Sequence, residues 1–270
     1  MASLLANIRR ANAVAHLPVA EPFAGGAGAS LSLLYLEETP EVFINDADPA
    51  IYDFWWTIVN RPSHFLGLLH TTPVSIQEWR RQRRIYQQRR TLSRVQRGFS
   101  AFYLNRCNRS GIIINGGPVG GQDQLGPWKL TARFNRQSLL LRCRRLTEYS
   151  GRIHVSGLDG ISFIDRIANP DTFLFIDPPY YHKGRMLYLD VPGDSYHTAL
   201  AAKLQTLPST PWVLTYDDCP EIRRLYRSWA RIRRFRIGYA ASERRMGHEV
   251  LITPKWMRLP AAQRSAAISW

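Results

Sequence analysis

The fold is decided by residues 19–28, which read Val19-Ala20-Glu21-Pro22-Phe23-Ala24-Gly25-Gly26-Ala27-Gly28. Residues 19–23 predict a short buried strand, and the glycines predict a tight turn into a leucine-rich helix over 27–36. A second strand over 41–44 and a helix over 49–59 follow, with Asp48 as N-cap and Pro49 in the first turn. Strands and helices that alternate through tight turns predict the start of a parallel α/β sheet.

The same alternation returns in the second half of the chain. We expect strands over 152–156, 173–176 and 212–216, helices over 157–166, 196–207 and 220–229, and a closing antiparallel pair over 231–238 and 249–253. The sequence therefore predicts one α/β core that is assembled from both ends of the chain.

The middle of the chain has a different character. A basic, polar helix is expected after Ser75, with Glu78 at the capping-box position, and residues 110–121 are too rich in glycine for a regular element. We expect a core formed by residues 1–60 and 137–260, a mostly helical and irregular insertion over 61–136, and a C-terminal tail over 261–270.

The charge balance indicates a polyanionic partner. Lys+Arg is 36 against Asp+Glu 21, a formal net charge of +15, and nucleic acid is the leading candidate over a merely basic surface. Three scattered cysteines without a C-x-x-C pair predict neither a disulfide framework nor a metal site, and they fit a reducing compartment. With no long apolar run, we expect a cytoplasmic protein that does not enter a membrane.

The glycine turn has the features of a nucleoside-cofactor site. Glycines allow a ligand to approach the backbone closely and leave N–H groups free at a helix N-terminus. Asp46 follows Gly25 by about 20 residues, at the end of the next predicted strand, where an acidic side chain can bind ribose hydroxyls. The turn is not G-x-G-x-x-G, so a dinucleotide site or a plain tight turn remains an alternative explanation.

A second motif follows the apolar strand 173–176 and reads Asp177-Pro178-Pro179-Tyr180. Open α/β sheets bind ligands at the carboxyl ends of their strands, which is where Asp177 is expected. A carboxylate and the Pro178 carbonyl can accept both N–H bonds of a nucleobase amine, which stabilises positive charge on that nitrogen. Tyr180 offers a flat face for a base that has left the stack. The alternative is a rigid Asp-Pro turn.

Arginines are concentrated in the predicted insertion. They include Arg80, Arg81, Arg83, Arg84, Arg89, Arg90, Arg94 and Arg97. We favour an interpretation in which this stretch contacts phosphates over one in which it is a solvated helix.

With these motifs in place, the sequence resembles the Dam-like (D12-class) DNA adenine-N6 methyltransferases, and it looks closest to the short orphan bacterial and phage-type members. The matching segments keep the family order: EPFAGGAG (21–28), FINDADPAIYDFW (43–55), FYLNRCNRSGIIINGGPVGG (102–121), ARFN (132–135), VSGLDG (155–160), FIDPPYY (175–181) and GHEVLI (247–252). They extend over nearly the whole chain. DPPY occurs in other aminomethyltransferases as well, so the specificity comes from the 102–121 segment and the motif order.

The resemblance implies a Rossmann-like, seven-stranded methyltransferase core with a DNA-recognition insertion. It implies methyl transfer from S-adenosyl-L-methionine to N6 of a flipped adenine in double-stranded DNA, by an orphan methylase or part of a restriction-modification pair. The implied cofactor contacts are Glu21, Phe23, Gly25, Asp46 at the ribose, Asp159 near the cofactor adenine, and Asp177. The implied catalytic groups are Asp177, Pro178 and Tyr180. The expected DNA contacts are Arg80, Arg84, Asn105, Arg106 and Arg109, with a structural role as the alternative for Asn105 and Arg106.

The N-terminus departs from the family pattern. Members usually begin with a motif like R-Y-P-G-G-K, whose lysine helps to bind the cofactor, whereas this chain begins MASLLANIRR. Arg9 or Arg10 is the candidate substitute. The departure keeps open a cofactor-poor DNA-binding homologue that works with a partner, and a change of substrate to RNA is the third hypothesis.

Overall fold

The computed structural model describes residues 1–88, 91–181, 193–238 and 246–260. Seven strands form one sheet in the order β3-β2-β1-β4-β5-β7-β6. They are β1 (Val19–Glu21), β2 (Val42–Asn45), β3 (Ile153–Ser156), β4 (Phe173–Ile176), β5 (Trp212–Asp217), β6 (Ala230–Gly238) and β7 (Met246–Pro254). Neighbours among β2, β1, β4 and β5 are parallel, and β7 is antiparallel to both β5 and β6. The α/β class and the closing antiparallel pair are confirmed.

The order of the strands locates the place where this sheet can bind a ligand. From β1 the chain adds β2 and β3 on one side, and it then returns to add β4 on the other side of β1. Ligands of open α/β sheets bind outside the carboxyl ends of the strands at such a reversal. Glu21 ends β1, and Asp177 follows β4 directly.

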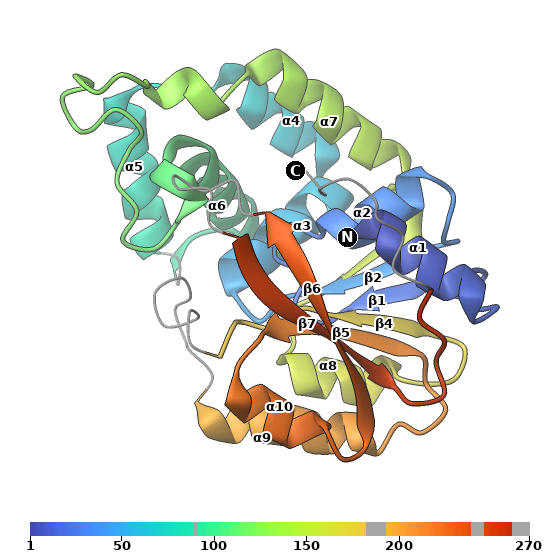
Figure 1. The fold of residues 1–270 in the computed structure, drawn as a ribbon. Helices are drawn as coiled ribbons and strands as arrows, with labels where there is room; N and C mark the ends of the chain where they lie inside the picture. The colour runs from blue at the N-terminus through green and yellow to red at the C-terminus, as the bar shows by residue number, and fades with distance from the viewer. Residues whose placement is uncertain (89–90, 182–192, 239–245, 261–270) are drawn as a thin grey trace. The chain divides into compact units, whose positions relative to one another are not determined.

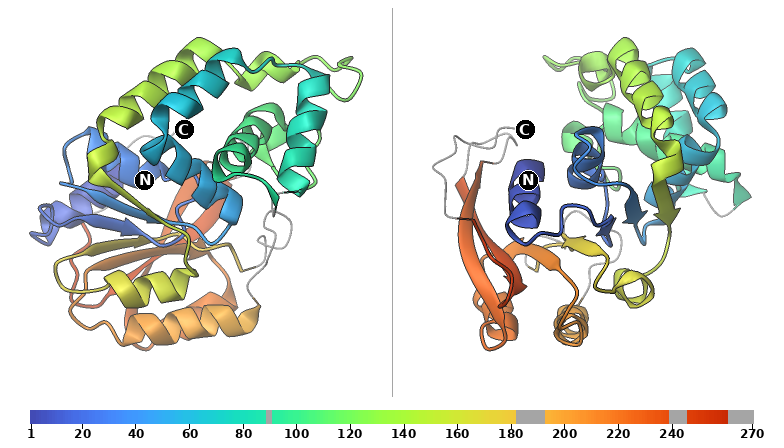
Figure 2. Two further views of the ribbon diagram at one scale, coloured as in Figure 1. Left: turned by 180° about the vertical axis from the view of Figure 1, so that it is seen from behind. Right: turned by 90° about the vertical axis from the view of Figure 1, so that its right-hand side faces the viewer.

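The chain divides into two compact units, Met1–Asp46 with Leu158–Trp270, and Ala47–Gly157. Helices of the first unit are α1 (Ala2–Ala11), α2 (Gly28–Tyr35), α8 (Gly160–Ile167), α9 (Asp194–Gln205) and α10 (Pro220–Tyr226). Figures 1 and 2 show α1 and α2 on one face of the sheet and α8, α9 and α10 on the other. The central strands are therefore covered on both sides, and the side chains of β4 are all buried.

Helix α1 was not expected from the sequence, and it contains Arg9, the candidate substitute for the family's cofactor-binding lysine. The Arg9 side chain is fully buried and donates to the carbonyls of Ala15, Leu17 and Glu38. Arg10 binds the Glu38 carboxylate. Arg9 thus holds α1 against the loops that flank β1, which is a structural role and not that of a substitute for a cofactor-binding lysine.

The second unit is a helical assembly of α3 (Pro49–Asn60), α4 (Pro62–Thr71), α5 (Ile76–Gln87), α6 (Arg94–Cys107) and α7 (Arg136–Glu148). Its described residues also include β3 and the short 3-10 turns η2 (Arg109–Gly111), η3 (Leu130–Arg133) and η4 (Ser150–Arg152). Helices α3 and α6 cross closely at Gly98, where an added Cβ would lie 2.4 Å from the backbone oxygen of Asp53. Packed aromatic rings, including Phe54, Phe65 and Phe102, fill the interior.

Helix starts in this unit follow the sequence signals. Asp48 caps α3 by accepting a hydrogen bond from the Ala50 N–H at 2.8 Å, as expected. Ser75 caps α5 through the Glu78 N–H, but the Glu78 carboxylate binds Arg81 and Gln82 and is not paired with the Ser75 backbone among the bonds described. A reciprocal capping box occurs instead at Ser93 and Gln96, at the start of α6.

Candidate functional site

The turn after β1 forms an open glycine loop at the carboxyl edge of the sheet. Gly25 has a φ of +47° and donates its N–H to Oδ2 of Asp46 at 2.8 Å. A Cβ added at Gly25, Gly26 or Gly28 would meet no atom within 4 Å. Neither backbone conformation nor protein packing requires glycine at 26 and 28, so the space in front of the loop is open to a ligand.

Asn45 ties this loop to two other segments. Its side chain is 1% exposed, and its amide nitrogen donates to the carbonyls of Pro22 and Leu158, each at 2.9 Å. Its amide oxygen accepts the Leu158 N–H at 2.8 Å. One side chain therefore fixes the ends of β1 and β2 and the loop before α8 relative to one another.

The loop before α8 places Phe23 and Asp159 around one tyrosine. Oδ1 of Asp159 caps α8 through the N–H groups of Ile161 and Ser162, while Oδ2 accepts the Tyr196 hydroxyl at 3.0 Å. The Tyr196 ring lies edge-on to Phe23, with centroids 6.4 Å apart. A Cβ on Gly160 would lie 2.3 Å from the Phe23 ring, so glycine at 160 is what allows Phe23 its position.

Glu21 is a buried acid at the end of β1. It is 4% exposed, accepts a hydrogen bond from the Ser30 hydroxyl, and has its pKa raised to about 8 by burial, with the charges of Asp177 and Asp46 adding to the rise and Ser30 opposing it. Glu21 is therefore largely protonated at neutral pH. The electrostatic effect of Asp177 and Asp46 on Glu21 shows that the structure gathers the three predicted carboxylates at one edge of the sheet.

Asp177 lies just beyond β4 and retains solvent access. Its Oδ1 accepts the Thr215 hydroxyl at 2.6 Å, and Oδ2 has no hydrogen-bond donor among the described residues. The protein packed around the carboxyl group raises its pKa to about 6, Thr215 lowers it, and Glu249 raises it further. Glu21 does not contribute to this shift, because it is still neutral in the pH range in which Asp177 ionises.

Tyr180 is held by Glu249. Its hydroxyl donates to Oε1 of Glu249 at 2.5 Å, and Glu249 is 2% exposed on β7. Pro178 is buried, and the Tyr181 N–H donates to Asp217 at the end of β5 at 3.0 Å. The Asp-Pro-Pro-Tyr loop is thus anchored to both β5 and β7, which orients the tyrosine ring. The residues that follow the loop, 182–192, lie outside the described part of the chain.

The predicted DNA contacts all belong to the second unit and have unequal surroundings. Arg80 and Arg84 are exposed on α5. Asn105 donates to the Gly111 carbonyl at 3.0 Å and holds the turn after α6. Arg106 is half-buried, and burial lowers its pKa, as do the charges of neighbouring arginines. Arg109 is exposed on η2.

Arg94 and Arg97 of the basic stretch share one buried structural partner and are not exposed phosphate clamps. Arg94 and Arg97 both bind the carboxylate of Asp53, at 3.1 and 2.5 Å, and Asp53 is 1% exposed. A buried carboxylate needs paired donors, so these arginines stabilise the α3–α6 contact. Arg89 and Arg90 lie outside the described residues.

A family model described as D12 class N6 adenine-specific DNA methyltransferase matches residues 3–240. The chain belongs to this family. Its members transfer a methyl group from S-adenosyl-L-methionine to N6 of adenine in DNA, and this is the activity of the chain. No curated protein matches the methyltransferase in sequence. No helix in the described part of the chain is long and apolar enough to cross a membrane.

Two solved structures resemble the methyltransferase at low sequence identity. A "conserved hypothetical protein" from Streptococcus pyogenes shares 10% identity at a TM-score of 0.36, with 90% of this chain and 89% of that chain covered. The rRNA methyltransferase aviRa from Streptomyces viridochromogenes shares 15% identity at a TM-score of 0.37, with 92% of this chain and 83% of that chain covered.

The open glycine loop fits the cofactor that this methyltransferase requires. A side chain at position 26 or 28 would not collide with the protein itself. A ligand that lies close to the loop would explain why both positions are glycine. Asp46 lies beside the loop, and Phe23 and Tyr196 supply aromatic surface on the same unit.

Several residues around the site were not found from the sequence. Thr215 is a polar side chain in an otherwise apolar run, and Glu249 directly precedes the apolar run 250–252. Asn45 ends a third strand, so a polar residue within or beside a buried strand was the available signal. Tyr196 lies in a helix without a distinguishing pattern, and nothing in the sequence connects it to Asp159.

Proposed function

We propose that Asp177 and the Pro178 carbonyl bind the N6 amine of a flipped adenine and that Tyr180 stacks against the base. The observation that supports this most directly is the state of Asp177, whose Oδ1 is fixed by Thr215 while Oδ2 has no donor among the described residues. A fixed acceptor at the end of β4 would favour a pyramidal amine nitrogen with an available lone pair. It would also stabilise the positive charge that develops on that nitrogen.

The same arrangement sets the protonation state that the reaction needs. Only as a carboxylate does Asp177 carry the negative charge that stabilises the developing positive nitrogen, and a pKa of about 6 leaves it ionised above that pH. Glu249 holds the Tyr180 hydroxyl, which fixes the ring as a stacking platform.

The cofactor supplies an electrophilic methyl group when it is bound. We propose that Phe23, Gly25 and Asp46 hold it, with Asp46 at the ribose. Glu21 and Asp159 complete the pocket, Asp159 near the cofactor adenine. Support comes from the open loop and from the clustering of these residues at the reversal of strand order.

The substrate in this proposal is double-stranded DNA, which Arg80, Arg84, Asn105, Arg106 and Arg109 of the second unit contact. A net charge of +15 supports a polyanionic partner. We place the activity in the cytoplasm, because the three cysteines are free and suit a reducing compartment.

The test is methyl transfer from radiolabelled S-adenosyl-L-methionine to duplex DNA. Asp177→Asn is expected to lower kcat by about 10²-fold or more, since it replaces a charged acceptor. Asp171→Asn, an exposed aspartate just before β4, serves as the matched control. Equal activity of Asp177→Asn and wild type would refute the proposed role of Asp177.

Two further measurements separate this proposal from its rivals. Calorimetry with S-adenosyl-L-methionine is expected to show binding, whereas DNA binding without cofactor binding would indicate a cofactor-poor homologue. Competition between duplex DNA and a structured RNA is expected to favour DNA, and a preference for RNA would replace the proposed substrate.

A further inference from the structure

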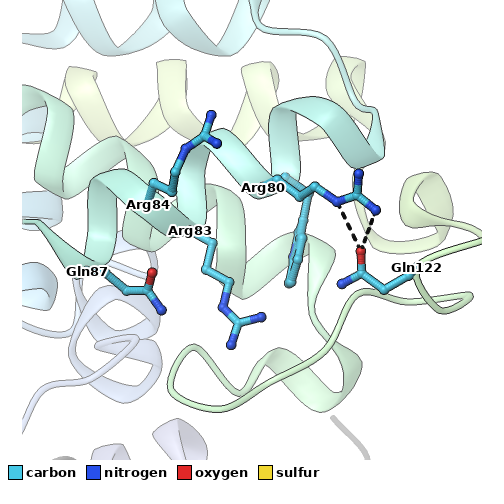
Figure 3. Close-up of a pocket in the computed structure, with 6 residues that line it drawn as sticks. Arg80, Arg83, Arg84, Gln87 and Gln122 are labelled. Carbon is cyan, nitrogen blue, oxygen red and sulfur yellow. Dashed lines mark hydrogen bonds between the residues drawn. The ribbon is translucent and has the colours of Figure 1, made fainter.

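The second unit carries an open pocket of about 360 Å³ on the surface of α5. It is lined by Trp79, Arg80, Arg83, Arg84, Gln87 and Gln122. Figure 3 shows Arg80 directed toward Gln122, with Arg83 extending from the same helix. The pocket lies within one unit, and the candidate methylation site lies in the other.

The charges of this pocket are not neutralised within the described protein. Arg83 and Arg84 follow Arg80 by three and four residues, so each lies beside Arg80 on α5, where like charges destabilise the helix. No described carboxylate forms an ion pair with any of the three, whereas Arg81 on the same helix binds Glu78 at 2.8 Å. Asp123 follows Gln122 in sequence, but no ion pair joins it to these arginines. The pocket therefore favours an anion from outside.

The Arg80 guanidinium already has the geometry of an anion contact. Its Nε and Nη2 both donate to Oε1 of Gln122, at 3.2 and 3.1 Å. Two donors of one arginine converging on one oxygen is an arrangement also used for phosphate oxygens. The uncharged Oε1 of Gln122 thus lies where a phosphate oxygen could bind Arg80. A phosphate can displace it because the negative phosphate attracts the guanidinium more strongly than a neutral amide does.

Arg83 is held in place by a buried aromatic ring. Its guanidinium carbon lies 5.3 Å from the centroid of Trp79, and Trp79 is 1% exposed. The indole N–H of Trp79 donates to Oδ1 of the buried Asn108 at 2.7 Å, so the ring itself cannot swing. A cation stacked on a fixed ring has lost part of its freedom before any ligand arrives, which lowers the entropy cost of binding.

We propose that this pocket binds a backbone phosphate of duplex DNA between Arg80 and Arg83, with Gln122 releasing Arg80 to the phosphate. The inference rests on the proposed duplex-DNA substrate and adds a sequence-independent contact to it. An open basic surface suits a polymer that passes over it, whereas small ligands are usually enclosed. Arg84 raises the local positive potential.

The test measures affinity for a fluorescein-labelled duplex by anisotropy over a sodium chloride series. Loss of one phosphate contact lowers the slope of log K against log salt by about 0.9, which weakens binding about eight-fold at about 0.1 M salt. Arg80→Gln and Arg83→Gln are each expected to show this change, by the same factor on duplexes of different sequence. Arg81→Gln is the matched control, since it removes the same charge from α5 at a residue that does not line the pocket and is paired with Glu78.

Gln122 provides a second and opposite pair of variants. Gln122→Glu gives Arg80 a permanent carboxylate and repels phosphate, so it is expected to weaken binding. Gln122→Ala removes the competing oxygen, and affinity is expected to be unchanged or higher. If Gln122→Glu binds DNA as wild type does, Arg80 is not a phosphate ligand.

These outcomes keep the inference separate from the proposed function. Wild type that neither binds nor methylates duplex DNA contradicts the proposed function itself. Wild type that does both, with Arg80→Gln and Arg83→Gln matching Arg81→Gln in affinity and slope, overturns only the pocket. The phosphate assignment also fails if Arg80→Gln and Arg83→Gln lose affinity for a structured RNA but not for the duplex. Thermal unfolding of each variant checks that the fold is retained.

Discussion

Replacing Glu21 with glutamine is expected to remove a pH-dependent loss of stability. Burial raises the pKa of Glu21 from 4.5 to about 8, so the folded chain keeps this proton at pH values where the unfolded chain has released it. The free energy of unfolding therefore falls as pH rises between about 4.5 and 8, by about 1.4 kcal/mol per pH unit. The full effect is about 5 kcal/mol at most, because movement of the loop or entry of water relieves part of the penalty.

The assay is urea unfolding of wild type and Glu21→Gln at several pH values from about 5 to about 8.5. Glutamine keeps an oxygen for the Ser30 hydroxyl and cannot ionise. The difference in unfolding free energy should grow with pH in favour of the variant and level off above about pH 8. Asp177 titrates in both proteins, so its effect cancels in the difference. Parallel pH profiles would show that Glu21 ionises in the folded chain as it does in the unfolded one, and would refute the reasoning.

Three other predictions follow from the site and the helical unit. Gly26→Ala should leave the thermal stability unchanged but weaken S-adenosyl-L-methionine binding by about ten-fold in calorimetry, since only a ligand would meet the new methyl group; unchanged affinity would place the cofactor elsewhere. The methylation rate should fall as pH drops below about 6, where Asp177 is protonated, and Glu249→Gln should move this limb to lower pH by removing a negative charge, while a fixed limb would contradict the coupling. Gly98→Ala should destabilise the protein by about 2 kcal/mol in urea unfolding, because its Cβ would overlap the backbone of Asp53, and wild-type stability would show that α3 and α6 can separate without cost.

The sequence predicted the core well because local signals and burial agreed there. The strand Phe173–Ile176 is four apolar residues followed by Asp177, and all four are buried as expected. The Asp48 cap and the turn at Gly25 were equally legible, because each requires a particular residue type at a particular place.

The remainder depended on contacts between residues far apart in sequence. Asp53 looks like an ordinary helix-surface acid until α6 brings Arg94 and Arg97 against it. Likewise, Glu249 reaches Tyr180 of the Asp-Pro-Pro-Tyr loop only because β7 lies between β5 and β6 in the sheet. Neither contact corresponds to a repeating pattern in the sequence, so neither could be predicted from it.

Asn45 shows how little freedom the site has at one position. Its side chain donates twice and accepts once, and among side chains of its length only an amide does both. Aspartate has the same shape but brings no N–H, and leucine brings neither group, so each would leave buried carbonyls without donors. The positions of the glycine loop, the end of β2 and the loop before α8 therefore all depend on one amide side chain.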